Sequence, residues 1–299
     1  MSLLPAAAGL LGDRVLGEPP AALHPVRGFG AVMRGVERRA WRDSRSRGVV
    51  HASGGVLLGA AAGFGVASTA GATWLSVGAR ALWTAASEVA TALAAHDLDA
   101  AREALPSLVG RDPTDLDEKE MARAVIESVA ENTVDAIVAP VLWAAVAGAP
   151  GALGYRAVNT LDAMVGHHSP RYENFGWASA RLDDLAGWVP ARVTAGLVAA
   201  VRPRGAGRVW VAVRRDAPAH PSPNAGVAEA AFAAALGLRL GGTNVYGERV
   251  EVRPPLGDGP PPEPADIGRA IRLSSDVARA LAAGLVLPSS RRARGRGRR

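Results

Sequence analysis

The longest uncharged segment of the sequence runs from Gly48 to Ala79 and constrains the fold more than any other feature. Within it, only His51 protonates readily. About twenty consecutive apolar residues cross a bilayer as a helix, so this segment is long enough for one span. Beyond Arg80 the apolar composition continues to Ala95 with Glu88 as the only further charge, which provides enough length for a pair of spans.

Two other segments approach spanning length. Ala136–Tyr155 is uncharged throughout, and Leu185–Val201 is shorter and interrupted by Pro190 and Arg192. The apolar segments 3–12 and 277–287 are too short to cross alone. These patterns predict an all-α fold, a polytopic integral membrane protein whose helices are joined by polar loops.

Arginine is concentrated immediately before the longest apolar segment. The arginines between positions 27 and 47 are opposed only by Glu37 and Asp43. Such a cluster beside an apolar run is typical of a cytoplasmic flank. The first basic residue follows the N-terminal apolar stretch, which argues against a signal peptide. A soluble, alanine-rich helical protein is the alternative, because the mean hydropathy is only +0.10.

The composition excludes several kinds of site. The sequence has no cysteine, which rules out disulfides, thiolate metal ligands and cysteine nucleophiles. The net charge is +6, and Lys119 is the only lysine. Arginine in place of lysine, together with abundant alanine, is typical of a GC-rich genome. Because basic stretches with interleaved aromatic residues do not occur, we predict no nucleic-acid partner.

We predict one domain over residues 1–288, followed by a basic tail, 289–299. The stretch DPTDLDEKE is expected to begin a helix, with Thr114 or Asp115 as its N-cap. The later elements alternate between apolar helices and polar connections. They are an apolar helix at 133–154, a polar segment at 155–184, an apolar helix at 185–201, a basic connector at 202–224, a small-residue helix at 225–240, a short strand within 241–255, a loop at 253–264 and a last helix at 265–285.

Familiar catalytic motifs are missing from the sequence. There is no phosphate loop, no G-x-G-x-x-G, no H-E-x-x-H and no G-x-S-x-G. His167 and His168 are adjacent, and neighbouring side chains on a helix or strand face different ways, so the pair has poor geometry for a metal.

Polar residues nevertheless gather beside the apolar segments. Glu127, Glu131 and Asp135 are spaced by four residues, which places them on one helical face. The simplest interpretation is an exposed amphipathic face, but carboxylates at the end of a span are costly unless they face a cavity, a partner or water. Such a row suits Mg²⁺, which is held by one or two carboxylates together with water and phosphate.

Three further polar clusters follow along the chain. Asn159 and Asp162 share a helical face, and the next polar stretch carries Arg171, Tyr172, Arg181, Asp183 and Asp184. RDAPAHPSPNAG contributes Asn224, and GGTNVYGE contributes Thr243 and Asn244. Paired glycines in the last segment allow the backbone to approach a ligand closely.

Six segments, in order along nearly the whole chain, carry a resemblance to a known family. They are GDRVLGEPPAALHPVRGFG at 12–30, RDPTDLDEKEMARAVIESVAENTVDAIVAP at 111–140, YRAVNTLDAMVGHH at 155–168, RYENFGWASARLDDLAGWVPARVTA at 171–195, RRDAPAHPSPNAG at 214–226 and GGTNVYG at 241–247. Together they resemble the CobD/CbiB family of cobalamin biosynthesis, the adenosylcobinamide-phosphate synthases. The N-terminal apolar segment looks shorter than in many members of that family, and the tail 289–299 lies outside the pattern.

The resemblance implies a multi-pass protein of the cell membrane whose active site faces the cytoplasm. It implies a carbon–nitrogen (acid–amine) ligase that joins aminopropanol, or its O-phosphate, to a carboxylate of adenosylcobyric acid. The product would be adenosylcobinamide or its phosphate. ATP and Mg²⁺ are the expected cofactors, because phosphoryl transfer would activate the carboxylate. Membrane lipid and other late cobalamin-pathway enzymes are expected partners.

This reading distributes roles among the polar residues. The expected metal ligands are Glu127, Glu131, Asp135 and Asp183, and the expected catalytic residues are Glu131, Asp162 and Asp184. The general base is Asp162 or His167, which the sequence does not rank. The expected substrate-binding residues are Asn159, Arg171, Tyr172, Arg181, Asn224, Thr243 and Asn244, with Arg215 as a further phosphate-binding candidate.

One alternative function and one geometric problem accompany this reading. A membrane corrinoid transporter, or a non-catalytic corrinoid-binding subunit, would share the spans and the acidic row but would form no amide. If Ala136–Tyr155 crosses the membrane once, the clusters at 127–135 and 159–184 lie on opposite sides. A shared site would then require a re-entrant or buried helix, or polar residues that meet within the bundle.

Overall fold

The computed structural model describes residues 2–20, 24–110, 112–167, 169–246 and 249–296. These residues are mostly helical, and their strands form one two-stranded antiparallel sheet. His168 and the last three residues of the basic tail lie outside the described ranges, so the His167–His168 pair stays a sequence prediction.

The chain divides into two compact units that alternate along the sequence. Unit 1 comprises Met1–Gly78, Asp135–Pro190 and Leu281–Arg299, and unit 2 comprises Ala79–Val134 and Ala191–Ala280. The boundary therefore passes through continuous helix three times, between Val134 and Asp135, between Pro190 and Ala191 and between Ala280 and Leu281.

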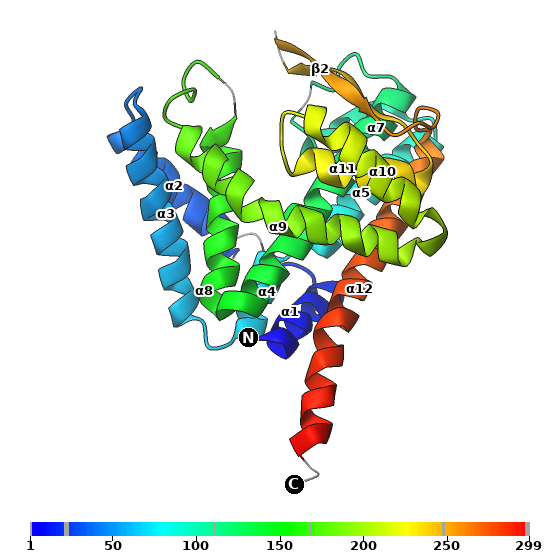
Figure 1. The fold of residues 1–299 in the computed structure, drawn as a ribbon. Helices are drawn as coiled ribbons and strands as arrows, with labels where there is room; N and C mark the ends of the chain where they lie inside the picture. The colour runs from blue at the N-terminus through cyan, green and yellow to red at the C-terminus, as the bar shows by residue number, and fades with distance from the viewer. Residues whose placement is uncertain (1, 21–23, 111, 168, 247–248, 297–299) are drawn as a thin grey trace. The chain divides into compact units, whose positions relative to one another are not determined.

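Unit 1 is built from long apolar helices. They are α1 (Leu3–Leu16), α2 (Pro25–Ala40), α3 (Arg45–Gly65), α4 (Thr69–Ser76), α8 (Ala139–Leu161) and parts of α9 (Trp177–Val201) and α12 (Pro264–Arg296). In Figure 1, α3 lies beside α8. Glycines at every fourth position of α3 allow this close approach, because a Cβ at Gly59 would lie only 2.5 Å from the Cβ of Ala157.

The apolar segment before Asn159 folds back on itself. Gly148 interrupts α8 with a φ of 67°, and Pro150 follows it within the helix. The two arms meet at their open end, where Asn159 Nδ2 lies 3.4 Å from the Oδ2 of Asp135. Each arm, Asp135–Ala147 and Ala149–Leu161, is only about 20 Å long at 1.5 Å per residue, short of the roughly 30 Å hydrocarbon core. This helical hairpin brings Asp135 and Asn159 to the same end, so these two residues do not lie at opposite ends of one straight helix.

Two helices are long and apolar enough to cross a membrane by length and composition, Arg45–Gly65 and Glu118–Gly166. The second contains the hairpin just described. The segment 48–95, which has enough length for a pair of spans, contains one such helix among the described residues, because the chain leaves α3 at Gly65 and the next two helices have only 8 and 16 residues. The segment 185–201 lies within α9, which does not meet the same criterion. Large apolar side chains of unit 1 are nevertheless exposed, among them Leu57 and Phe64 of α3 and Leu185 of α9.

Unit 2 consists mainly of shorter helices and contains the β-hairpin. Its elements include α5 (Ala79–Ala94), α6 (Leu98–Ala104), α7 (Glu118–Asn132), α10 (Ala206–Asp216), α11 (Ala225–Leu236), β1 (Leu240–Tyr246) and β2 (Arg249–Leu256). The expected strand is confirmed and has an antiparallel partner, with Thr243 opposite Val252. In Figure 1 the strands lie beside α7 and α11.

Several predicted boundaries are wrong for local reasons. Helix α7 is capped by Asp117, which forms a capping box with Glu120, whereas Thr114 bonds to Asp112. The predicted polar segment 155–184 is helical up to Gly166 and again from Trp177. The connector 202–224 contains α10, and the loop 253–264 begins only after β2 ends at Leu256.

Candidate functional site

Unit 1 gathers a polar cluster at the open end of the α8 hairpin. Asn159 Nδ2 lies 3.4 Å from Asp135 and 3.5 Å from Asp183 Oδ1, so one amide joins two carboxylates. The hydroxyl of Tyr155 donates to Asp135 Oδ1 at 3.4 Å. Asp135 lies in the π-helical turn Thr133–Val138, and Asp162 begins a second one, Asp162–Gly166. Such turns occur often at functional sites.

Arg156 adds a cation to this cluster that the sequence reading overlooked. Its Nη1 donates to Asn159 Oδ1 at 3.4 Å, and this contact orients the amide so that its NH₂ faces the carboxylates. The cluster therefore contains Asp135 and Asp183 on one side of Asn159 and Arg156 on the other.

Glu18 and His24 lie in the same unit close to Asp135. His24 caps α2 by accepting the Val26 N–H at Nδ1, and its Nε2 is 3.5 Å from Glu18. A Cβ at Gly78 would lie 3.1 Å from a Glu18 oxygen, and the Gly78 N–H donates to Ala136 O. These contacts place Glu18 beside the residue that follows Asp135. The motif that contains both residues was recognised in the sequence, but neither residue was selected from it.

Arg171 and Tyr172 are bound by α2. The buried carboxylate of Glu37 accepts from Arg171 at 3.1 Å and from the Tyr172 hydroxyl at 2.8 Å. The Arg171 guanidinium also lies 4.6 Å from the ring centroid of Trp41. His167 packs edge-on against Tyr172, with ring centroids 5.0 Å apart. The immediate role of both predicted substrate residues is therefore to hold the turn 169–176 against α2.

The acidic pair at the start of α9 divides between two environments. Asp183 faces Asn159, whereas Asp184 accepts from Arg181 at 3.4 Å. Burial raises the pKa of Asp184, and the neighbouring Arg181 opposes this shift. Asp162 is packed against Gly166, where a Cβ would lie 1.8 Å from its Oδ1.

Unit 2 has its own polar cluster between α7 and β1. The buried Glu127 accepts the Gly241 N–H at 2.8 Å and lies 3.3 Å from Arg123 Nη1. Arg123 also donates to Asn244 Oδ1 at 3.0 Å and to Thr243 O at 2.8 Å. The paired glycines do permit a close approach, with φ of 83° at Gly241, but the group they admit is a carboxylate of the protein itself.

A cavity of about 100 Å³ lies beside this cluster. Glu127, Ser128, Glu131 and Arg253 line it together with the segment 108–110. Glu131 is the exposed member, so the cavity offers one accessible carboxylate and one guanidinium.

A set of charged residues that sequence reasoning missed lies between α11 and β2. Glu229 of α11 has a fully buried side chain 3.7 Å from His220 Nε2 and 3.8 Å from Arg253. Arg253 also pairs with Glu251 at 3.1 Å. Burial is the main cause that lowers the pKa of His220. The available signal was Glu229, the only charged residue in the helix AGVAEAAFAAAL.

The remaining predicted residues of unit 2 hold local structure. Asn224 Oδ1 accepts from Arg192 at 3.1 Å, and Arg192 also donates to Pro223 O. Arg215 bridges Asp216 and Asp258, and Asp216 accepts the Gly257 N–H at 2.9 Å. Both arginines thus connect the ends of helices to neighbouring turns.

The four expected metal ligands do not form one ready-made centre. Glu127 and Glu131 belong to unit 2, and Asp135 and Asp183 belong to unit 1. Among the described residues, no group of three or more His, Cys, Asp or Glu side chains is placed to hold a metal ion. Unit 1 offers the pair Asp135 and Asp183, which is the number that Mg²⁺ commonly takes from protein when phosphates complete its shell, whereas unit 2 offers Glu131 as its accessible carboxylate.

The fold and the site define a class of helical protein in which an apolar unit carries carboxylates, an amide and an arginine at the open end of a folded-back helix. The family model described as "CobD/Cbib protein" matches residues 6–274. The chain belongs to the CobD/CbiB family of cobalamin biosynthesis, as its resemblance implied.

Curated relatives agree with this assignment. A cobalamin biosynthesis protein CobD of Mycobacterium tuberculosis is 49% identical over 287 residues, covering 90% of each chain. Proteins of the same name from Chromobacterium violaceum and Rhodobacter capsulatus are 46% and 44% identical, covering 88% and 87% of this chain and 89% of each relative. No solved structure matches this chain.

Proposed function

We propose that this protein is the ATP-dependent ligase of its family's pathway. It would join aminopropanol, or its O-phosphate, to a carboxylate of adenosylcobyric acid. The observation that carries the proposal is the pair Asp135 and Asp183, both within reach of the single amide of Asn159 at the mouth of an apolar hairpin. Ionisable groups on apolar helices are costly, which favours a catalytic or binding role for them.

The proposed reaction balances in two steps. A substrate carboxylate oxygen attacks the γ-phosphorus of ATP and ADP leaves, which gives an acyl phosphate. The amine then attacks the acyl carbon, inorganic phosphate leaves, and a base takes the ammonium proton. Asp162 and His167 remain the two candidates for that base. Asp184 lies in the same unit and is a further proposed catalytic carboxylate, whose pKa is raised by burial.

Asp135 and Asp183 fit a divalent ion as oxygen ligands, and Asn159 would orient them. When bound, Mg²⁺ would neutralise the phosphates. Glu131 is the accessible carboxylate of the unit 2 cavity and stays a proposed catalytic residue. The apolar helices of unit 1 suit a corrinoid, which has a large apolar face. In the proposed arrangement, the open end of the hairpin would lie at the membrane surface.

Amide formation by detergent-purified protein tests the proposal. The assay supplies adenosylcobyric acid, aminopropanol phosphate, Mg²⁺ and ATP, and compares wild type with Asp135→Asn, Asp183→Asn and Glu131→Gln. Asp99→Asn is the matched control, because Asp99 has a 99% exposed side chain. ATP-dependent product that is lost in Asp135→Asn and Asp183→Asn supports the ligase and its site. Corrinoid binding without product in folded wild type would favour a transporter or a binding subunit.

A further inference from the structure

Arg156 occupies a position on α8 where an unpaired cation is costly. It lies on the second arm of the hairpin, immediately after the uncharged segment that ends at Tyr155. Charged side chains at such positions pair with one another, contact water or mark the path of a ligand. The partner of Arg156 is therefore informative about what this site binds.

Within the described residues, Arg156 has no carboxylate at ion-pair distance. Its one side-chain hydrogen bond is the 3.4 Å contact to Asn159, and its Nε is buried without a hydrogen-bond partner. A guanidinium has five N–H donors in a planar fork, so most of its capacity is unused. The protein alone thus leaves this cation incompletely satisfied.

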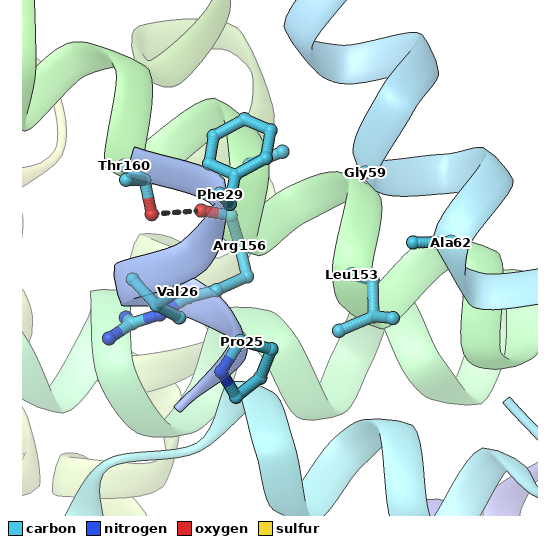
Figure 2. A pocket seen from close by; sticks show the side chains of 9 residues that line it. Pro25, Val26, Phe29, Gly59, Ala62, Leu153, Arg156 and Thr160 are labelled. Carbon is cyan, nitrogen blue, oxygen red and sulfur yellow. Dashed lines mark hydrogen bonds between the residues drawn. The ribbon is translucent and has the colours of Figure 1, made fainter. Parts of the chain in front are cut away.

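The same side chain borders an apolar cavity. A space of about 80 Å³ lies between α2, α3 and α8. Figure 2 shows the guanidinium of Arg156 reaching toward α2 beside Val26. Leu153 of α8 and Gly59 of α3 also line this space. Its other walls are Pro25, Phe29, Ala62, Ala157 and Thr160. Apolar walls exclude water and strengthen the attraction between the guanidinium and an anion.

We propose that Arg156 binds a phosphate group of a ligand at this cavity. A guanidinium fork matches phosphate oxygens bidentately, and Arg156 reaches the amide of Asn159, which contacts both Asp135 and Asp183. Resting on the proposed function, the phosphate is that of ATP, held between Arg156 and the ion on the carboxylate pair. The other source with the same chemistry is the headgroup of an anionic lipid.

The test measures binding rather than turnover. ATP binding in the presence of Mg²⁺ is measured by titration calorimetry on the detergent-purified full chain. The comparison covers wild type, Arg156→Gln, Arg156→Lys and Arg38→Gln, an exposed arginine of α2 in the same unit. Loss of charge-assisted hydrogen bonds predicts about 10- to 100-fold weaker ATP binding in Arg156→Gln. Arg156→Lys should fall between, and Arg38→Gln should match wild type.

A second arm separates the two phosphate sources. The same proteins are placed in vesicles of phosphatidylcholine with and without phosphatidylglycerol, extracted, and examined for bound lipid by native mass spectrometry. Unchanged ATP affinity with loss of bound phosphatidylglycerol in Arg156→Gln assigns the phosphate to lipid. Unchanged binding of both ligands in a folded variant overturns the inference. Should Arg156→Gln fail to fold, Arg156→Lys decides by the same comparison.

The outcomes also separate this inference from the proposed ligase. Wild type that forms no amide, yet loses a phosphate ligand when Arg156 is replaced, refutes the ligase and keeps the binding site. Wild-type amide formation with unchanged ligand binding in the variants keeps the ligase and removes the role of Arg156.

Discussion

Replacing Gly59 by alanine tests whether α3 and α8 are in contact as closely as the structure indicates. The added Cβ would lie 2.5 Å from the Cβ of Ala157 and 2.9 Å from the carbonyl oxygen of Leu153. Carbon atoms pack at about 3.5–4.0 Å, so the helices must separate by about 1 Å. One of the two obstructing atoms is backbone, so rotation of a side chain cannot remove the clash.

Overpacking of this kind costs about 1–3 kcal/mol, set against a gain of up to about 1 kcal/mol from the helix propensity of alanine. Gly54→Ala is the matched control, because it lies in the same helix with nothing within 4 Å of a Cβ at its position. Denaturation in detergent, followed by circular dichroism, should show Gly59→Ala less stable than wild type and Gly54→Ala equal or more stable. Equal stability of the two variants would refute the close contact.

Three further predictions concern side chains of both units. Arg123→Gln should loosen β1 from α7, because Glu127 would stay buried without its cation, a loss that costs about 3–5 kcal/mol. Proteolysis within 240–256 should then accelerate, and unchanged proteolysis would contradict the anchoring role of Arg123. Because burial lowers the pKa of His220, the unfolded chain binds the proton first as the pH falls below about 6.5. The free energy of unfolding should therefore decrease as the pH falls, with a limiting slope of about 1.4 kcal/mol per pH unit. The variant His220→Asn should flatten this dependence between about pH 7 and pH 5, and an unaltered slope would remove His220 as its cause. Tyr172→Phe removes a hydroxyl from the buried Glu37 and should cost about 1–3 kcal/mol in thermal unfolding with amide formation retained; loss of activity at unchanged stability would instead favour a substrate role.

The sequence predicted most helices because apolar composition and periodicity are local properties. It also grouped Asp135 and Asp183 as metal ligands and assigned Asn159 to substrate binding, and the amide of Asn159 lies near both carboxylates. The bend that brings Asn159 to Asp135 had a local signal, since Gly148 and Pro150 interrupt the apolar run. Hydropathy alone does not distinguish a straight span from a folded-back helix, whereas a glycine and a proline two residues apart indicate the bend.

The pairing of charges could not be predicted in the same way. Arg171 and Glu37 are separated by 134 residues, and no local pattern connects a basic residue to one of several distant carboxylates. The same holds for Arg123 with Asn244 and for Glu229 with Arg253. Consequently, residues expected to bind substrate, such as Arg171 and Asn244, were selected for their chemistry before their partners within the protein were known.

The energetic balance of the α8 hairpin favours a functional origin for its charges. Burying ion pairs and amides adds little net stability compared with apolar residues of similar volume, because the desolvation cost offsets most of the attraction. The hairpin itself is closed by Gly148 and Pro150 and by packing of α8 against α3, none of which requires Asp135, Arg156 or Asn159. A chain selected only to fold would therefore carry apolar residues at these three positions. The charged ligand that we propose would account for their presence at the open end of the hairpin.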